Sequence, residues 1–388
     1  MLFKKTLTHI SVIGAILACL ISSALAQVEF ESRAKFAILM DYESGTVLYQ
    51  KNADEPMEPA SMAKLMTIAV VFERLKSGQL ELSDEFFISE KAWREGGASS
   101  GGSTMFAELN SKVSVENLVK SVIIQSGNDA SIALAEGIGG TEDSFVRVMN
   151  ELAADIGLEN SNFENSTGLP DENMLVTARD LANLGRYIIK NFPEYYDIFA
   201  QEAFEWNGIN QRNRNTLLDD GIGVDGLKTG HTEASGYGIV ASTTEGGRRL
   251  VAVLHGMESM SERREEARKL ITWGTRTFEK LETFKDGEIV GEVGVYGGEI
   301  PKVGLIGDGA IDLYVPKGSR RCLNARIVYQ GPIMPPVDRG QYLADLHVYC
   351  DENLIQKTPL YAVETVEQGD LVRQATDALK ELTLGWLN

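Results

Sequence analysis

Three short motifs follow one another along this chain, and they constrain it more than any other feature. Ser61-Met62-Ala63-Lys64 places a hydroxyl and an amine three residues apart, at the predicted start of a helix. That spacing brings both side chains to one face of the helix, one turn apart. Ser126-Gly127-Asn128 and Lys228-Thr229-Gly230 follow in that order. Each motif is weak alone, but the ordered S-x-x-K, S-x-N and K-T-G combination predicts an active-site serine enzyme.

The residue types fit acyl transfer to a serine. Ser61 needs a base, and Lys64 can serve when burial and a second cation such as Lys228 keep its amine neutral. Ser126 can relay a proton to the leaving amine, and Asn128 can hold Lys64 while donating to a substrate carbonyl. No G-x-S-x-G sequence marks another nucleophile and no H-E-x-x-H sequence marks a zinc site. We therefore expect neither a metal nor a cofactor.

The third motif supplies the remaining contacts expected for the substrate. Lys228 adds positive potential for an anionic substrate terminus, and Thr229 and Gly230 lie beside it on a predicted strand at a sheet edge. The oxyanion hole should use the backbone N–H groups of Ser61 and His231. The side chain of His231 either lines the cleft or is a polar residue at its rim.

In these motifs and their context the chain resembles the low-molecular-mass penicillin-binding proteins, specifically the D-alanyl-D-alanine carboxypeptidases of peptidoglycan metabolism. The resemblance implies an α+β fold: a penicillin-recognising serine transpeptidase/β-lactamase-like domain, then a small all-β sandwich domain and a C-terminal amphipathic helix. The matching segments are Pro59–Thr67, Ser126–Ala130, Asn165–Leu169, Thr177–Asp180, Asn213–Asn215, Val224–Thr232 and Leu270–Gly274.

The resemblance also implies roles for residues outside the motifs. Arg263 matches a family arginine that helps to hold the terminal carboxylate of the substrate, and the adjacent Arg264 leaves the choice between the two open. Arg214 and Asp180 match family positions near the cleft, with structural salt bridging as the alternative.

The implied activity is that of a serine-type D-Ala-D-Ala carboxypeptidase. It would remove the terminal D-alanine from peptidoglycan stem peptides through an acyl-enzyme, with β-lactam antibiotics as inhibitors. A class A-like β-lactamase is an alternative, but the second motif is S-G-N rather than S-D-N, and no Glu in 150–180 has an Asn four residues later. A D,D-endopeptidase and a non-catalytic peptidoglycan-binding protein also stay open.

The N-terminus has the pattern of a secretory signal peptide. Lys4 and Lys5 precede an apolar run over 10–21, and Ala24-Leu25-Ala26 supplies small residues for cleavage. Lipoprotein processing at Cys19 is the alternative. Export would place the protein in the periplasm. The net charge of −19 argues against nucleic acid as a partner.

Four segments are expected along the 388 residues. They are a signal peptide (1–26), a catalytic serine D,D-peptidase domain (27–285), a β-sandwich domain (286–367) and an amphipathic C-terminal helix (368–388). From about Asp286, short Val/Ile/Leu/Tyr runs alternate with Gly/Pro/Asp turns, which is typical of a small all-β domain.

Finer expectations concern single elements of these segments. A hairpin is predicted over 35–50, and helices should start near Ser114 and Thr141. The glycine- and serine-rich stretch 96–103 is either a plain surface loop or a mobile rim of the substrate cleft. Cys322 and Cys350 form one disulfide or remain two buried thiols in neighbouring strands.

The C-terminal segment is expected to lie in a membrane interface. Its charged side chains fall away from the apolar face, and it has too few apolar residues to span a bilayer. We therefore expect peripheral attachment to the outer face of the inner membrane. Docking on the rest of the chain and pairing with another copy are the competing interpretations. The apolar face comprises Leu371, Ala375, Ala378, Leu382 and Trp386.

Overall fold

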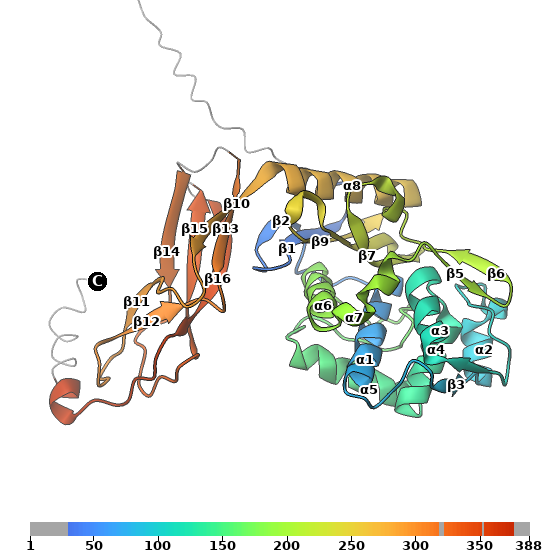
Figure 1. Ribbon diagram of the computed structural model, residues 1–388, viewed down its shortest axis with the longest axis horizontal. Helices are drawn as coiled ribbons and strands as arrows, with labels where there is room; N and C mark the ends of the chain where they lie inside the picture. The colour runs from blue at the N-terminus through green and yellow to red at the C-terminus, as the bar shows by residue number, and fades with distance from the viewer. Residues whose placement is uncertain (1–29, 318–321, 351–352, 376–388) are drawn as a thin grey trace, which may run out of the picture.

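The computed structural model describes residues 30–317, 322–350 and 353–375 and has two lobes (Figure 1). The first lobe mixes helices with a central antiparallel sheet, and the second is built almost entirely of strands. This is the α+β arrangement that the sequence predicts. The signal segment, residues 1–26, lies outside the described residues.

The five-stranded central sheet has the order β2-β1-β9-β8-β7. The hairpin predicted over 35–50 is confirmed as β1 and β2. β7 pairs only with β8 in this sheet, so the K-T-G motif lies on an edge strand as predicted. The strands are β1 Phe36–Asp41, β2 Val47–Lys51, β7 Val224–Thr232, β8 Gly236–Thr243 and β9 Leu250–Met257.

Both faces of the central sheet are buried, and the side chains of β9, which alternate between the two faces, show how. Leu250, Ala252 and Leu254 pack toward α8, whereas Val251 and Val253 join the core on the opposite face. Figure 1 shows α8 along one face, with α1, α5 and α6 on the other side. The helices are α1 Lys64–Lys76, α2 Glu90–Gly96, α3 Val115–Lys120, α4 Asn128–Gly139, α5 Glu142–Asp155, α6 Ala178–Asn191, α7 Pro193–Tyr196 and α8 Met260–Thr277.

Two predicted helix starts are confirmed by side-chain caps. The Ser114 and Thr141 hydroxyls accept hydrogen bonds from the backbone N–H groups of Asn117 and Ser144, respectively. Such caps satisfy donors that have no partner within the helix. Smaller hairpins complete the first lobe, formed by β3 Glu85–Phe87 with β4 Lys112–Ser114, and by β5 Ala203–Trp206 with β6 Ile209–Arg212.

The second lobe is the expected sandwich of two sheets. One sheet has the order β11-β12-β16-β15-β14, and the other pairs β10 with β13. β10 follows α8 directly and lies within the range expected for the catalytic domain, yet its Leu281 and Phe284 pack against the core of this lobe. The strands are β10 Phe278–Phe284, β11 Gly291–Gly294, β12 Lys302–Ile306, β13 Ile311–Pro316, β14 Leu323–Val328, β15 Tyr342–Cys350 and β16 Asn353–Ala362.

Little of the expected C-terminal helix falls within the described residues. Residues 371–375 are helical, and residues 376–388 lie outside the described part of the chain. The amphipathic helix over 368–388 therefore stays a prediction. Within the described ranges, every helix is too short or too polar to cross a bilayer.

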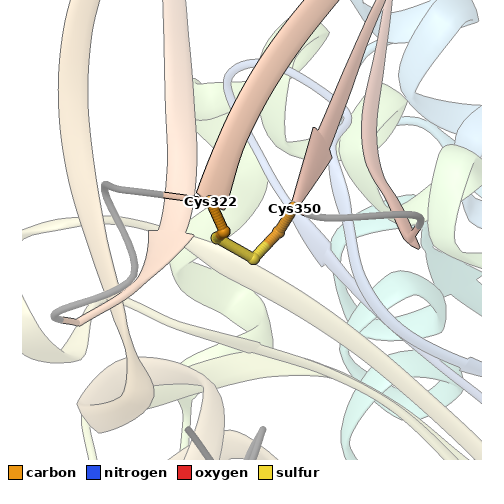
Figure 2. The surroundings of a disulfide bond; sticks show 2 residues. All are labelled: Cys322 and Cys350. Atoms are coloured by element: carbon orange, nitrogen blue, oxygen red, sulfur yellow. A yellow bond between two sulfur atoms is a disulfide. The ribbon is translucent and has the colours of Figure 1, made fainter. Parts of the chain in front are cut away.

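Cys322 and Cys350 form a disulfide (Figure 2). Leu323 pairs with Cys350 in the ladder between β14 and β15, so the bond joins these two strands at one end of the ladder. The Cα atoms lie 4.7 Å apart, within the usual range for a disulfide. This arrangement selects the disulfide from the two possibilities that the sequence leaves open.

Reduction of this disulfide should destabilise the sandwich. The two cysteines are 28 residues apart, and closing a loop of that length stabilises a fold by about 3.5 kcal/mol in the chain-entropy model. Unfolding in urea, followed with and without reductant, measures the change, and a Cys322→Ser/Cys350→Ser variant serves as the control that reductant leaves unchanged. Two free thiols per chain, titrated under denaturing and non-reducing conditions, would contradict the bond.

Candidate active site

Ser61 and Lys64 meet at a tight turn that leads into α1. Ala60–Ala63 form a 3₁₀ turn, and the α-helix begins at Lys64 itself. Side chains three residues apart eclipse one another in 3₁₀ geometry. The Lys64 Nζ and Ser61 Oγ atoms consequently lie 3.0 Å apart. The predicted pairing is present, on a 3₁₀ turn instead of the first turn of an α-helix.

Three oxygen atoms surround the Lys64 amine. Besides Ser61 Oγ, they are Asn128 Oδ1, at 2.8 Å, and the backbone carbonyl oxygen of Thr167. A neutral amine has two N–H donors and one lone pair. An amide oxygen and a carbonyl oxygen only accept hydrogen bonds, so they take both N–H groups. In the neutral form the lone pair is thus left for Ser61, whose hydroxyl can donate to it across the 3.0 Å contact.

Burial favours the neutral form of this amine. The side chain of Lys64 is completely buried, which lowers its pKa from 10.5 to about 7. The cation of Arg214 lowers the pKa further, while Asp129 and Glu142 act in the opposite direction. An amine that is neutral near pH 7 can take a proton from a serine hydroxyl.

A group of cations lies beside the amine, in which Lys228 and Arg263 are buried and Arg214 is exposed. Burial is the main reason why Lys228 has a pKa well below its ordinary value, and Lys64, Arg214 and Arg263 add repulsion. Burial also lowers the pKa of Arg263 to about 10. Among the described residues, none of Lys228, Arg214 and Arg263 forms an ion pair with a carboxylate. Their shared positive potential is suited to an anionic group from a ligand.

The structure separates the two adjacent arginines on α8. Arg264 is half-exposed and forms an ion pair with Asp220. Arg263 is buried, lies 5.9 Å from the centre of the Tyr237 ring, and donates a hydrogen bond to the Arg214 carbonyl. Only the guanidinium of Arg263 therefore joins the group of cations beside the K-T-G strand.

Two further charged residues that the resemblance associates with the cleft differ in their surroundings. The Arg214 Nε donates to the Gln125 carbonyl over 2.8 Å, in place of a salt bridge. Asp180 instead accepts hydrogen bonds from the Asn160 backbone and the Ser161 hydroxyl. Arg214 thus lies with the site, whereas Asp180 stabilises a loop.

Ser126 has an unusual conformation. It follows one π turn over Ser121–Gln125 and lies in the left-handed region, with φ +71° and ψ 32°. A non-glycine residue pays about 1 kcal/mol or more for this conformation. Its Oγ is buried and has no hydrogen-bond partner. Strain and an unsatisfied buried hydroxyl together indicate a group poised to bind a ligand.

The K-T-G strand lies against the turn that carries Ser61. At Gly230, a Cβ atom would stand 3.1 Å from the Met62 backbone nitrogen and 3.1 Å from the Pro59 carbonyl oxygen, so the close approach favours glycine. Thr229 is buried next to it. His231 is exposed, and its ring stacks on that of Tyr237 at 3.8 Å between centroids. Its side chain is thus part of the rim.

The glycine- and serine-rich stretch 96–103 borders the S-x-N motif. The Ser103 carbonyl accepts a hydrogen bond of 2.7 Å from the Asn128 backbone, and a Cβ at Gly102 would lie 2.9 Å from the Asn128 amide nitrogen. Of the two possibilities for this stretch, its position favours the rim of the site.

Sequence reasoning missed three contributors. Thr167 acts through its carbonyl, which every residue type has, so no side-chain pattern could reveal it. Tyr237 packs between His231 and Arg263, in a strand that otherwise reads as ordinary β structure. Glu142 influences Lys64 from the start of α5, where acidic residues are common for helix-dipole reasons.

Comparison with known proteins gives a consistent result. A family model described as D-alanyl-D-alanine carboxypeptidase matches residues 22–259, and one described as the C-terminal domain of penicillin-binding protein 5 matches residues 278–368. The chain is 39% identical over 347 residues to the D-alanyl-D-alanine carboxypeptidase DacC of Escherichia coli strain K12, covering 89% of this chain and 87% of the relative.

Solved structures are similar as well. Penicillin-binding protein 5 from Haemophilus influenzae superposes with a TM-score of 0.75 at 38% identity, covering 88% of this chain and 99% of that chain. Penicillin-binding protein D2 from Listeria monocytogenes, in its ampicillin-bound form, has a TM-score of 0.55 at 26% identity, covering 63% of this chain and 98% of that chain.

Acylation of Ser61 should depend on pH through Lys64. Because the pKa of Lys64 is about 7, the amine is mainly protonated below pH 7 and mainly neutral above it. The acylation rate with fluorescent penicillin should therefore rise about tenfold per pH unit well below pH 7 and level off above it. A Lys64→Ala variant should stay folded and lose acylation at every pH. A flat profile from about pH 5.5 to 8.5 would contradict this role.

Proposed function

The chain belongs to the D-alanyl-D-alanine carboxypeptidase family of serine-type peptidases, and we propose that Ser61 is its nucleophile and Lys64 its general base. The observation that carries this proposal is the buried amine, which lies 3.0 Å from Ser61 Oγ and donates to two groups that only accept, the Asn128 amide oxygen and the Thr167 carbonyl. The substrate is the terminal D-Ala-D-Ala bond of peptidoglycan stem peptides, and the reaction is hydrolysis.

The reaction proceeds in two stages. Ser61 Oγ attacks the carbonyl carbon of the penultimate D-alanine while its proton passes to Lys64. The backbone N–H groups of Ser61 and His231 stabilise the oxyanion. The proton is relayed through Ser126 to the departing amine, so that D-alanine leaves and an acyl-enzyme remains. Water, activated by the same amine, then releases the shortened peptide and regenerates Ser61.

The cations hold the substrate in register with Ser61. Lys228 and Arg263, together with the Thr229 hydroxyl, bind the terminal carboxylate, and Asn128 donates to a substrate carbonyl. Their burial supports this role, since a charge-assisted hydrogen bond is stronger where water is excluded. Arg214 adds to the same positive potential.

β-Lactams are proposed to acylate the same serine. A β-lactam presents an amide and a carboxylate in an arrangement similar to that of the peptide terminus. The ampicillin-bound form of the related Listeria protein supports this proposal. D,D-endopeptidase activity stays a second possibility, since it uses the same residues and differs in the groups that follow the scissile bond.

Ser61→Ala tests the nucleophile. The variant should bind a stem-peptide analogue but lose both D-alanine release and covalent labelling by fluorescent penicillin, because no acyl-enzyme can form. D-alanine release and gel fluorescence measure the two effects on the same preparation. Normal labelling of Ser61→Ala would overturn the assignment.

Arg263 and Arg264 form a matched pair for testing carboxylate binding. Arg263→Gln should lower kcat/KM for a peptide ending in free D-Ala-D-Ala by about 10- to 100-fold, the value of a lost charge-assisted hydrogen bond. Arg264→Gln should stay within about twofold, because Arg264 pairs with Asp220 on the surface. A C-terminally amidated peptide should be insensitive to both changes. Equal losses in the two variants would contradict the assignment.

We further propose export through the signal segment and peripheral attachment to the outer face of the inner membrane through residues 368–388. The apolar face of the tail supports this, although three acidic residues against two basic ones give little attraction to anionic lipid, so attachment would rest on apolar burial.

Liposome flotation tests the tail. The chain without residues 1–26 should float with liposomes, whereas a variant that ends at Gly369 should stay soluble and keep its activity, since the described active site lies in the first lobe. Recovery of both proteins in the soluble fraction would show that the tail is not an anchor.

A further inference from the structure

The turn that supplies the Thr167 carbonyl is held from several sides. Within the turn, the Asn165 Oδ1 accepts hydrogen bonds from the backbone N–H groups of Thr167 and Gly168. The Ser166 carbonyl accepts hydrogen bonds from the hydroxyls of Thr67 on α1, at 2.8 Å, and Ser131 on α4, at 2.6 Å. The Thr167 carbonyl is therefore fixed in relation to the two helices whose first residues are Lys64 and Asn128.

Glu142 provides the contact from α5. Its Oε1 accepts from both the Ser166 backbone N–H, at 3.0 Å, and the Ser166 hydroxyl, at 2.7 Å. Its Oε2 lies 2.7 Å from the Nζ of Lys91 on α2. The side chain of Glu142 is only 8% exposed, whereas that of Lys91 is 39% exposed. One buried carboxylate thus binds the Ser166 donors with one oxygen and a solvent-accessible cation with the other.

We propose that Glu142 is a positioning residue for acylation, because it holds Ser166 so that the adjacent Thr167 carbonyl takes one N–H of the Lys64 amine. This inference rests on the proposed function of Lys64 as the general base. If the turn moves, Thr167 no longer takes that N–H, and the amine can rotate its lone pair away from Ser61. Substrate binding depends on β7 and α8, which Glu142 does not contact through any of its hydrogen bonds or ion pairs in the described chain.

The charge state of Glu142 is consistent with this role. Burial acts to raise its pKa, but the hydrogen bonds from Lys91 and Ser166 outweigh burial and hold the pKa below its ordinary value. Glu142 therefore stays ionised and accepts from both Ser166 donors at every pH at which the enzyme would work.

Three variants test the proposal. The quantity measured is the rate of acylation by fluorescent penicillin, expressed per active site after the active sites have been titrated. Glu142→Ala should lower the acylation rate constant by about 10- to 100-fold, as a misplacement of about 1 Å can do, with less than about a threefold change in KM for the peptide. Glu142→Gln keeps an oxygen acceptor for Ser166 and should restore most of the rate. Lys91→Met removes only the outer ion pair and should stay within about twofold of wild type.

A purely structural role predicts a different result. It would lower the melting temperature and the number of titratable sites, but leave the rate per site unchanged. That result would overturn the proposal. So would equal losses in the Ala and Gln variants, or a loss in Lys91→Met as large as in Glu142→Ala. Failure of the proposed function is distinguishable, because wild-type protein would then fail to be labelled or Ser61→Ala would be labelled normally.

Discussion

The active site depends above all on keeping water away from one amine. Burying an ammonium group costs several kcal/mol, and the Lys64 side chain avoids much of this cost by giving up its proton. The packed core around α1 thus lowers the pKa of Lys64 as well as stabilising the fold. Every polar neighbour of the amine is consistent with the neutral form, because two of them only accept hydrogen bonds and the third has a hydrogen to donate.

The same burial gives opposite results for neighbouring cations. Lys64 becomes a base, whereas the guanidinium of Arg263 keeps its proton because even its lowered pKa is about 10. A lysine and an arginine in similar surroundings thus divide the work between proton transfer and charge recognition. Lys228 lies between the two roles, because burial and then repulsion from Lys64, Arg214 and Arg263 lower its pKa.

The sequence predicts the side-chain chemistry of the site better than its support. Ser61, Lys64, Asn128 and the edge strand follow from motif spacing and strand pattern, because identity and periodicity are both visible in a sequence. The Thr167 carbonyl and the left-handed Ser126 are properties of the backbone, and a string of residue types does not record them. β10 escaped prediction because it follows α8 without a turn, and its partner β13 lies about 30 residues further along the chain.

The edge position of β7 also bears on the kind of molecule that the proposed site would accept. A free edge is usually a hazard, because any extended chain can add to it as a further strand. Here the turn at Pro59 to Met62 stands so close to Gly230 that a side chain at this position of the edge strand would be crowded. A ligand that binds as an added strand is recognised through its main-chain amides and its chain direction more than through the identity of its side chains. A rigid compound that reproduces these few features of a peptide backbone could occupy the same place. Acceptance of peptides with different side chains and inhibition by compounds that resemble a peptide backbone would then have the same structural cause.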